Sequence, residues 1–163
     1  MEIIASIFVT GAGATLLTDL WGWLRRPLLG VPSPDYGLVG RWLGHMQQGR
    51  FRHAAIAHSP ALRGERLFGW LAHYAIGIGF AVLLYLFAGA AWFARPTLTP
   101  ALAVGLATAA APFLLMQPAM GAGIAASRTP RPAAARVNTL IMHGVFGAAL
   151  YVSAMAARLA LPA

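Results

Sequence analysis

The 163 residues are 59% hydrophobic and only 10% charged, whereas a soluble domain carries roughly 25% charged residues. This composition excludes a water-facing globular surface, so we expect a single membrane domain over residues 1–163. The formal net charge of +8 comes from arginines at the ends of apolar runs, a placement typical of membrane flanks, so no nucleic-acid partner is expected. The absence of cysteine excludes disulfides, thiolate metal sites and iron–sulfur clusters.

Four apolar segments are long enough to cross a bilayer as helices, which takes about 20 residues each. They cover residues 3–24, 67–93, 98–124 and 137–159. The sequence therefore predicts an all-α, polytopic membrane protein with four transmembrane helices. No basic segment precedes the first apolar run, so we expect a retained span and not a cleaved signal peptide.

The first span carries Asp19, six residues before Arg25. A carboxylate within hydrocarbon is costly unless it faces protein, so it is a functional-site hypothesis by default. A stripe of small residues lies beside Asp19, at Gly11, Thr15, Thr18 and Gly22, which is typical of a helix-packing face.

The linker 25–66 is basic and contains an amphipathic stretch. Apolar residues recur there at helical spacing, at Leu38, Val39, Trp42, Leu43 and Met46. This pattern predicts a short helix in the membrane interface after the first span, with a solvated loop as the alternative. Besides the lipid bilayer itself, we expect anionic lipid headgroups as partners, bound by Arg41, Arg50 and Arg52.

Arginine counts predict the orientation of the spans. The linkers 25–66 and 125–136 hold ten arginines, and the opposite side holds only Arg95 and Arg158. We therefore expect a bacterial cytoplasmic (inner) membrane protein with both linkers in the cytoplasm and both termini in the periplasm.

The second and fourth spans each place a histidine seven residues after an arginine, His73 after Arg66 and His143 after Arg136. Both histidines belong to runs of small residues at four-residue spacing, so they should face neighbouring helices and not lipid. The glycines expected to pack helices together are Gly69, Gly77, Gly147, Gly121 and Gly123.

The third span is uncharged but is interrupted by Pro112 and Pro118. Proline frees backbone groups that then need new partners. Two interpretations remain open, a kinked helix and a broken or re-entrant segment that lines a cavity. Gln117 is the strongly polar residue of this span.

Asp19, His73 and His143 all lie roughly 9–10 Å inside the arginine level on the cytoplasmic side. With Gln117 they form a candidate substrate or proton site. A carboxylate beside an imidazole suits a proton relay. The same His73, His143 and Asp19 are a possible divalent-metal set, and two histidines could ligate a haem iron. Hydrogen bonding across the bundle is the purely structural alternative.

The linker histidines give a weaker signal. His45, His53 and His58 are spaced by eight and five residues, which matches no standard ligand motif, so no zinc site is predicted there.

Several strings resemble a bacterial inner-membrane family known as domain of unknown function 2938. They include Gly40-Arg41-Trp42-Leu43-Gly44-His45, Gly49-Arg50-Phe51-Arg52-His53, Gly64-Glu65-Arg66, Gln117-Pro118 and the segment 127–132. The resemblance covers nearly the whole chain and implies a four-span protein of similar length. It supplies no activity, cofactor or catalytic residue.

The leading functional hypothesis is a small transporter- or channel-like bundle with an intramembrane proton- or cation-handling site. The first alternative is a non-catalytic scaffold or accessory subunit that packs a partner through small-residue helix faces. The second is a subunit that binds haem through two histidines, or a metal. No nucleophile arrangement favours an enzyme, and passage of a solute through so narrow a bundle would favour a homodimer.

Overall fold

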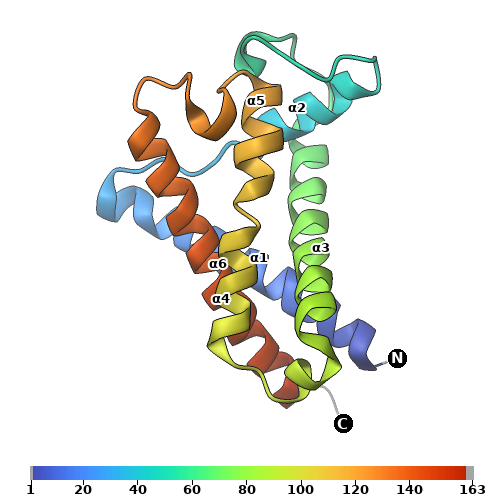
Figure 1. Cartoon of the computed structure of the whole chain (residues 1–163). Helices are drawn as coiled ribbons and strands as arrows, with labels where there is room; N and C mark the ends of the chain where they lie inside the picture. Colours follow the sequence, from blue (N-terminus) through green and yellow to red (C-terminus); the bar gives the residue numbers. More distant parts are fainter. Residues whose placement is uncertain (1, 161–163) are drawn as a thin grey trace. The chain divides into compact units, whose positions relative to one another are not determined.

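The computed structural model describes residues 2–160, with the backbone alone for Glu2. In chain order its elements are α1 (Glu2–Leu29), α2 (Tyr36–Met46), η1 (Ile56–His58), α3 (Glu65–Ala94), α4 (Leu98–Ala107), η2 (Pro112–Met116), α5 (Gln117–Met120), η3 (Ile124–Ala126) and α6 (Pro132–Ala160) (Figure 1). Across residues 2–160 every regular element is helical, which confirms the all-α fold.

Four helical segments are long and apolar enough to cross a membrane. They are Ile3–Leu29, Glu65–Ala94, Leu98–Met120 and Pro132–Ala160. This confirms the four expected spans, with different ends. The first helix continues beyond Leu24, and the last begins at Pro132, ahead of position 137. Pro132 suits a first helical position because a proline has no N–H to leave unpaired there.

The amphipathic stretch of the first linker is helical, as expected, and forms α2. Asp35 caps its N-terminus with an extended backbone, and its side chain accepts a hydrogen bond of 2.9 Å from the Gly37 N–H. Such a cap satisfies one of the free N–H groups at a helix start. The position of α2 in the membrane interface stays a prediction.

The third span is an interrupted helix. α4 ends at Ala107, a π-helical segment occupies Pro112–Met116, and α5 ends at Met120, before the expected end at residue 124. Gly121 terminates α5 with φ of 101°, a left-handed conformation that favours glycine. Pro112 lies at the start of the π segment, where it contributes no N–H to the helical ladder.

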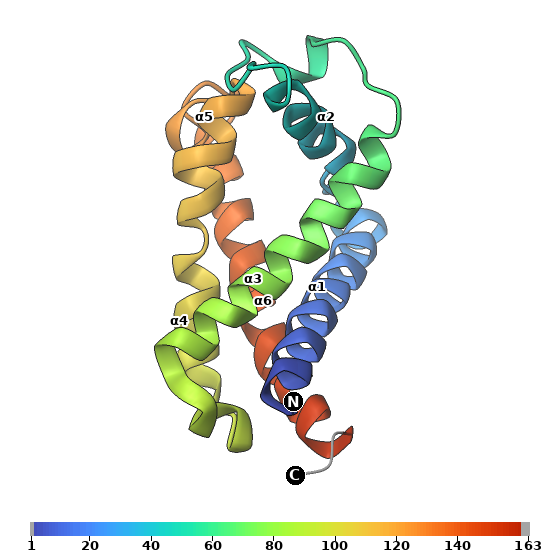
Figure 2. The same ribbon diagram turned by 90° about the vertical axis from the view of Figure 1, so that its right-hand side faces the viewer.

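The chain divides into two compact units. Unit 1 comprises the described residues up to Ser33, Tyr74–Thr108 and the described part of Ile141–Ala163. It contains α1, α4 and the C-terminal parts of α3 and α6. Both views show the start of α1, the end of α6 and the α3–α4 turn at one end of this unit (Figures 1 and 2).

Unit 1 has an apolar core that includes Leu84 and Leu150, and α1 adds buried threonines to it while its large apolar side chains face outward. On α1, Thr10 and Thr15 are fully buried, whereas Leu16 is 47% and Trp23 is 55% exposed. A water-soluble helix would show the reverse pattern. A helix that buries its polar side chains and exposes leucines and aromatic rings is arranged as expected in lipid.

Unit 2 comprises Pro34–His73 and Ala109–Leu140. It contains α2, η1, α5, η3 and the N-terminal parts of α3 and α6. Trp42, Ile56 and Ala119 form its small core. The His53 N–H donates to the Ala119 carbonyl at 2.8 Å, so the long first linker is bound to the end of the third span.

Candidate functional site

Asp19 is a buried carboxylate on α1, with 5% of its surface exposed. The Tyr74 side chain of α3 forms a side-chain hydrogen bond with it and lies within range of its charge. Thr15 and Thr18 flank Asp19, and each donates its hydroxyl hydrogen to a backbone carbonyl four residues earlier, at 2.8 Å. These two hydroxyls can therefore act further only as acceptors.

His143 on α6 belongs to the same unit and contacts α4. Its Nδ1 lies 3.1 Å from Thr108 Oγ1 and 3.2 Å from the Gly105 carbonyl oxygen. The Thr108 hydroxyl already donates to that carbonyl at 2.6 Å. Toward His143, the Thr108 oxygen and the Gly105 carbonyl oxygen can therefore only accept. We assign the hydrogen to Nδ1 and the lone pair to Nε2. Nε2 is thus the proton-accepting atom of a neutral His143.

Asp19 and His143 meet α3 at different levels. Asp19 interacts with Tyr74, whereas the His143 ring lies 6.4 Å from the Phe80 ring, centroid to centroid. Tyr74 and Phe80 are six residues apart, which is about 9 Å along a helix. Within unit 1 the two ionisable groups therefore have separate sets of neighbours.

The other two residues of the predicted site belong to unit 2. The His73 ring stacks on the Tyr36 ring with centroids 3.8 Å apart and 19° between the planes. The Gln117 side-chain amide donates to Thr139 Oγ1 at 3.4 Å, and its carbonyl oxygen is buried without a hydrogen-bond partner among the described residues. His73 and Gln117 thus contact different residues within unit 2.

The metal hypothesis has a simple geometric requirement, which is that three ligating side chains lie together. Among residues 2–160, no group of three or more His, Cys, Asp or Glu side chains is arranged to hold a metal ion. The set His73, His143 and Asp19 is also divided between the two units.

The glycines expected at helix contacts occur in two settings. A Cβ on Gly77 would collide with the Thr15 hydroxyl of α1, and a Cβ on Gly147 would lie 2.9 Å from the Ala101 carbonyl oxygen of α4. Likewise, a Cβ on Gly69 would collide with the Tyr36 backbone. The remaining two, Gly121 and Gly123, have φ of 101° and 76° and form the turn after α5.

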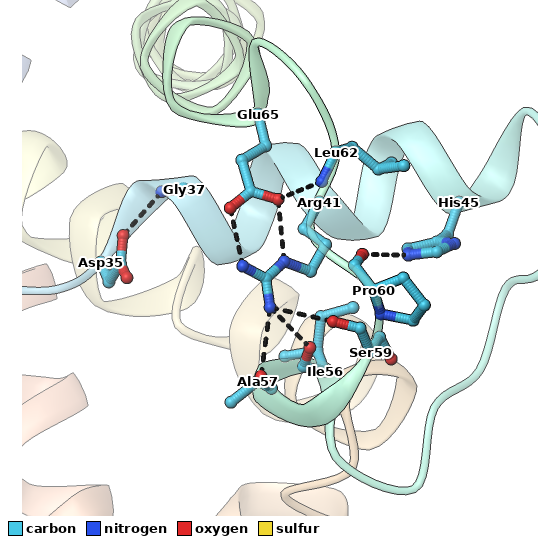
Figure 3. A network of polar contacts seen from close by, with 10 residues as sticks. All are labelled: Asp35, Gly37, Arg41, His45, Ile56, Ala57, Ser59, Pro60, Leu62 and Glu65. Atoms are coloured by element: carbon cyan, nitrogen blue, oxygen red, sulfur yellow. Dashed lines mark hydrogen bonds and ion pairs between the residues drawn. The ribbon is translucent and has the colours of Figure 1, made fainter.

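An ion pair that the sequence interpretation missed organises unit 2 (Figure 3). The Arg41 guanidinium donates to both Glu65 carboxylate oxygens, from Nη2 at 2.7 Å and from Nε at 2.8 Å. A two-point Arg–carboxylate contact fixes both position and orientation. Arg41 Nη1 also donates to the carbonyls of Ala57 and Ser59, at 3.1 Å each, and Glu65 accepts from the Leu62 N–H at 2.8 Å.

The Arg41 network joins α2, η1 and the start of α3. The hydrogen bond that Arg41 donates to Glu65 raises the pKa of Arg41 above its ordinary value, so the guanidinium stays charged. Arg50 and Arg52, in contrast, are exposed. Arg41 therefore differs from the two other arginines predicted to meet lipid. The signal in the sequence was Glu65, an acidic residue that closes a linker with seven arginines.

Four membrane-length apolar helices with many exposed leucines and aromatic rings define the class, a multi-pass integral membrane protein. The chain belongs to the family described as Protein of unknown function (DUF2938), whose model matches residues 8–157. The resemblance noted from the sequence strings is thereby confirmed. No curated protein and no solved structure matches the chain.

Proposed function

We propose that the protein is a small transporter- or channel-like membrane protein of the bacterial inner membrane, in which Asp19 exchanges a proton or binds a cation. The observation that carries the proposal is the burial of this carboxylate on a spanning helix, at 5% exposure. Ionisable groups within spans are rare because they are costly, and they commonly mark ion or proton pathways.

The pairing with Tyr74 supports proton exchange. A tyrosine hydroxyl can donate to a carboxylate and can accept from a carboxylic acid. Because Tyr74 forms a side-chain hydrogen bond with Asp19, that bond can persist in both protonation states with the hydroxyl reoriented. An exchanging site needs a partner of this kind, since neither state should be strongly disfavoured.

His143 supports the same proposal as a second proton-accepting group within unit 1. Its Nδ1–H is held by Thr108 and Gly105, which leaves Nε2 to take a proton. The separation of about 9 Å between the Tyr74 and Phe80 levels of α3 is too long for direct transfer. We therefore expect any exchange between Asp19 and His143 to pass through water.

The test is proton uptake by proteoliposomes that contain a pH-sensitive dye, driven by a potassium gradient with valinomycin. Wild-type protein should raise the uptake rate above that of empty vesicles, and Asp19→Asn should reduce the increment at least tenfold. Tyr74→Phe should reduce it less, because the carboxyl group remains. Asp35→Asn is the matched control, since asparagine caps a helix as well as aspartate does.

Equal uptake by wild-type protein and Asp19→Asn, both correctly folded, would refute the proposal. That result would favour the alternative of a non-catalytic scaffold or accessory subunit. The scaffold needs the helix contacts of Gly77 and Gly147 but no ionisable group at position 19.

A further inference from the structure

A pair of histidines in unit 2 carries an inference that is independent of Asp19. His45, near the end of α2, has only 2% of its surface exposed. Its Nε2 lies 3.0 Å from the Pro60 carbonyl oxygen (Figure 3). A carbonyl only accepts, so we assign the hydrogen to Nε2 and a lone pair to Nδ1. Nδ1 is buried and has no hydrogen-bond partner among the described residues.

His53, in the loop after α2, shows the same combination. Its Nδ1 lies 2.9 Å from Ser59 Oγ, whereas its Nε2 is buried and without a hydrogen-bond partner in the described part of the chain. Hydrogen bonds hold the loop at Phe51 and at His53 itself. The Trp42 indole donates to the Phe51 carbonyl at 3.0 Å, and the His53 N–H donates to Ala119 at 2.8 Å.

The two rings are as far apart as two imidazoles bound to one metal ion. Their centroids are separated by 5.2 Å. A metal–nitrogen bond of about 2 Å, plus roughly 1.2 Å from nitrogen to ring centre, places each centroid about 3.2 Å from the ion. A tetrahedral angle at the ion then separates the two centroids by about 5 Å.

The hydrogen bonds made by the second ring nitrogen of each histidine are also those expected of metal ligands. A ligating histidine usually gives its other ring nitrogen to a carbonyl or another oxygen, which fixes the tautomer and the ring orientation. Pro60 and Ser59 supply these oxygens here. A buried nitrogen with no partner is otherwise destabilising, and a shared ion would satisfy both at once.

We propose that His45 Nδ1 and His53 Nε2 bind one divalent cation of the zinc, nickel or copper group, with water completing its coordination. Imidazole nitrogen suits these ions. With two neutral ligands and no carboxylate, the affinity should be modest, in the micromolar range. The ion would link the end of α2 to the 47–55 loop and, through His53, to Ala119.

The test uses tag-free full-length protein in detergent, stripped with a chelator, with Zn²⁺ as the probe. Equilibrium dialysis with elemental analysis should give about one ion per chain. His45→Gln keeps an amide donor for Pro60, and His53→Asn keeps one polar atom for Ser59, but each removes the free ring nitrogen. Each variant should raise the Kd for Zn²⁺ at least about tenfold.

His58→Asn is the matched control, because His58 is exposed and belongs to the same linker, and it should bind Zn²⁺ as the wild type does. Cu²⁺-loaded wild-type protein should show electron paramagnetic coupling to two imidazole nitrogens. Absence of Zn²⁺ binding, or binding that survives both His45→Gln and His53→Asn, would overturn the proposal. Loss of binding in His58→Asn equal to that in His45→Gln would overturn it as well.

Discussion

At the scale of single residues, the three arginines predicted to meet lipid occupy two environments. The Arg41 guanidinium is bound to Glu65 and to backbone carbonyls of the η1 region. Arg50 and Arg52 are exposed on either side of Phe51, whose ring is 56% exposed. An exposed aromatic ring between two arginines suits a membrane surface, where the ring enters the interface and the arginines meet phosphates.

Replacement by glutamine should therefore weaken lipid binding at Arg50 and Arg52 but lower thermal stability at Arg41. Arg50→Gln and Arg52→Gln should each weaken binding of anionic lipid about fivefold, which corresponds to about 1 kcal/mol per arginine at a membrane surface, and should leave thermal stability unchanged. Arg41→Gln should lower the Tm by roughly 3 °C or more and leave lipid binding unchanged. Native mass spectrometry of lipid adducts and thermal unfolding in detergent measure the two effects. Weaker lipid binding by Arg41→Gln would contradict this division.

The sequence predicts which ionisable residues are costly to bury in a membrane span, but not which residues they contact there. Asp19 was identified from its depth in an apolar run, and the structure buries it. Tyr74 was not predicted as its neighbour, because the rotation of two helices about their axes decides that contact. The contact between Arg41 and Glu65 is not visible in the sequence, because the two residues are 24 positions apart.

At the scale of helices, the closest contact of α1 with α3 depends on glycine. A Cβ on Gly11 would lie 2.5 Å from the Ile78 Cα, and a Cβ on Gly77 would collide with the Thr15 hydroxyl. Without side chains at these positions the two backbones can approach, which increases van der Waals contact in the absence of a hydrophobic driving force between helices in lipid. Asp19 and Tyr74 belong to this same pair of helices.

Gly77→Ala should therefore destabilise the protein, by about 1–3 kcal/mol as is typical of overpacking. Gly79→Ala is a matched control on the same helix, because its Cβ would meet nothing within 4 Å. That variant should be neutral or slightly stabilising, since alanine favours a helix by up to about 1 kcal/mol over glycine. Thermal unfolding in one detergent compares them. A Gly77→Ala protein as stable as Gly79→Ala would show that the helices can separate without cost.

The existence of the helices was predictable from hydropathy, but their ends were not. α1 runs through Arg25, Arg26 and Pro27 to Leu29. Arg25 is buried, and its Nη2 donates to the Pro32 carbonyl at 3.3 Å, a contact beyond the helix that hydropathy does not indicate. The two prolines of the third span predicted a disturbance there. They did not indicate its form, a π-helical segment after a turn at Thr108.

At the scale of the whole molecule, unit 2 brings together parts of both basic linkers. The His53 N–H is hydrogen-bonded to Ala119, and a Cβ on Gly121 would collide with the Ala54 carbonyl. Two segments that contact each other directly must lie on one side of a membrane. The first linker therefore lies on the side of the membrane where the third span ends, and the assignment of that side to the cytoplasm stays a prediction from the arginine counts.

Single-cysteine labelling tests that orientation without background, because the chain contains no cysteine. Ala61 and Ser127 are exposed in the two linkers, and Thr97 is exposed in the α3–α4 turn. Thr97→Cys should react with a membrane-impermeant maleimide in spheroplasts, since the α3–α4 turn is expected in the periplasm. Ala61→Cys and Ser127→Cys should react only in inverted vesicles. The reverse pattern would invert the topology, whereas opposite behaviour of Ala61→Cys and Ser127→Cys would contradict the shared unit itself.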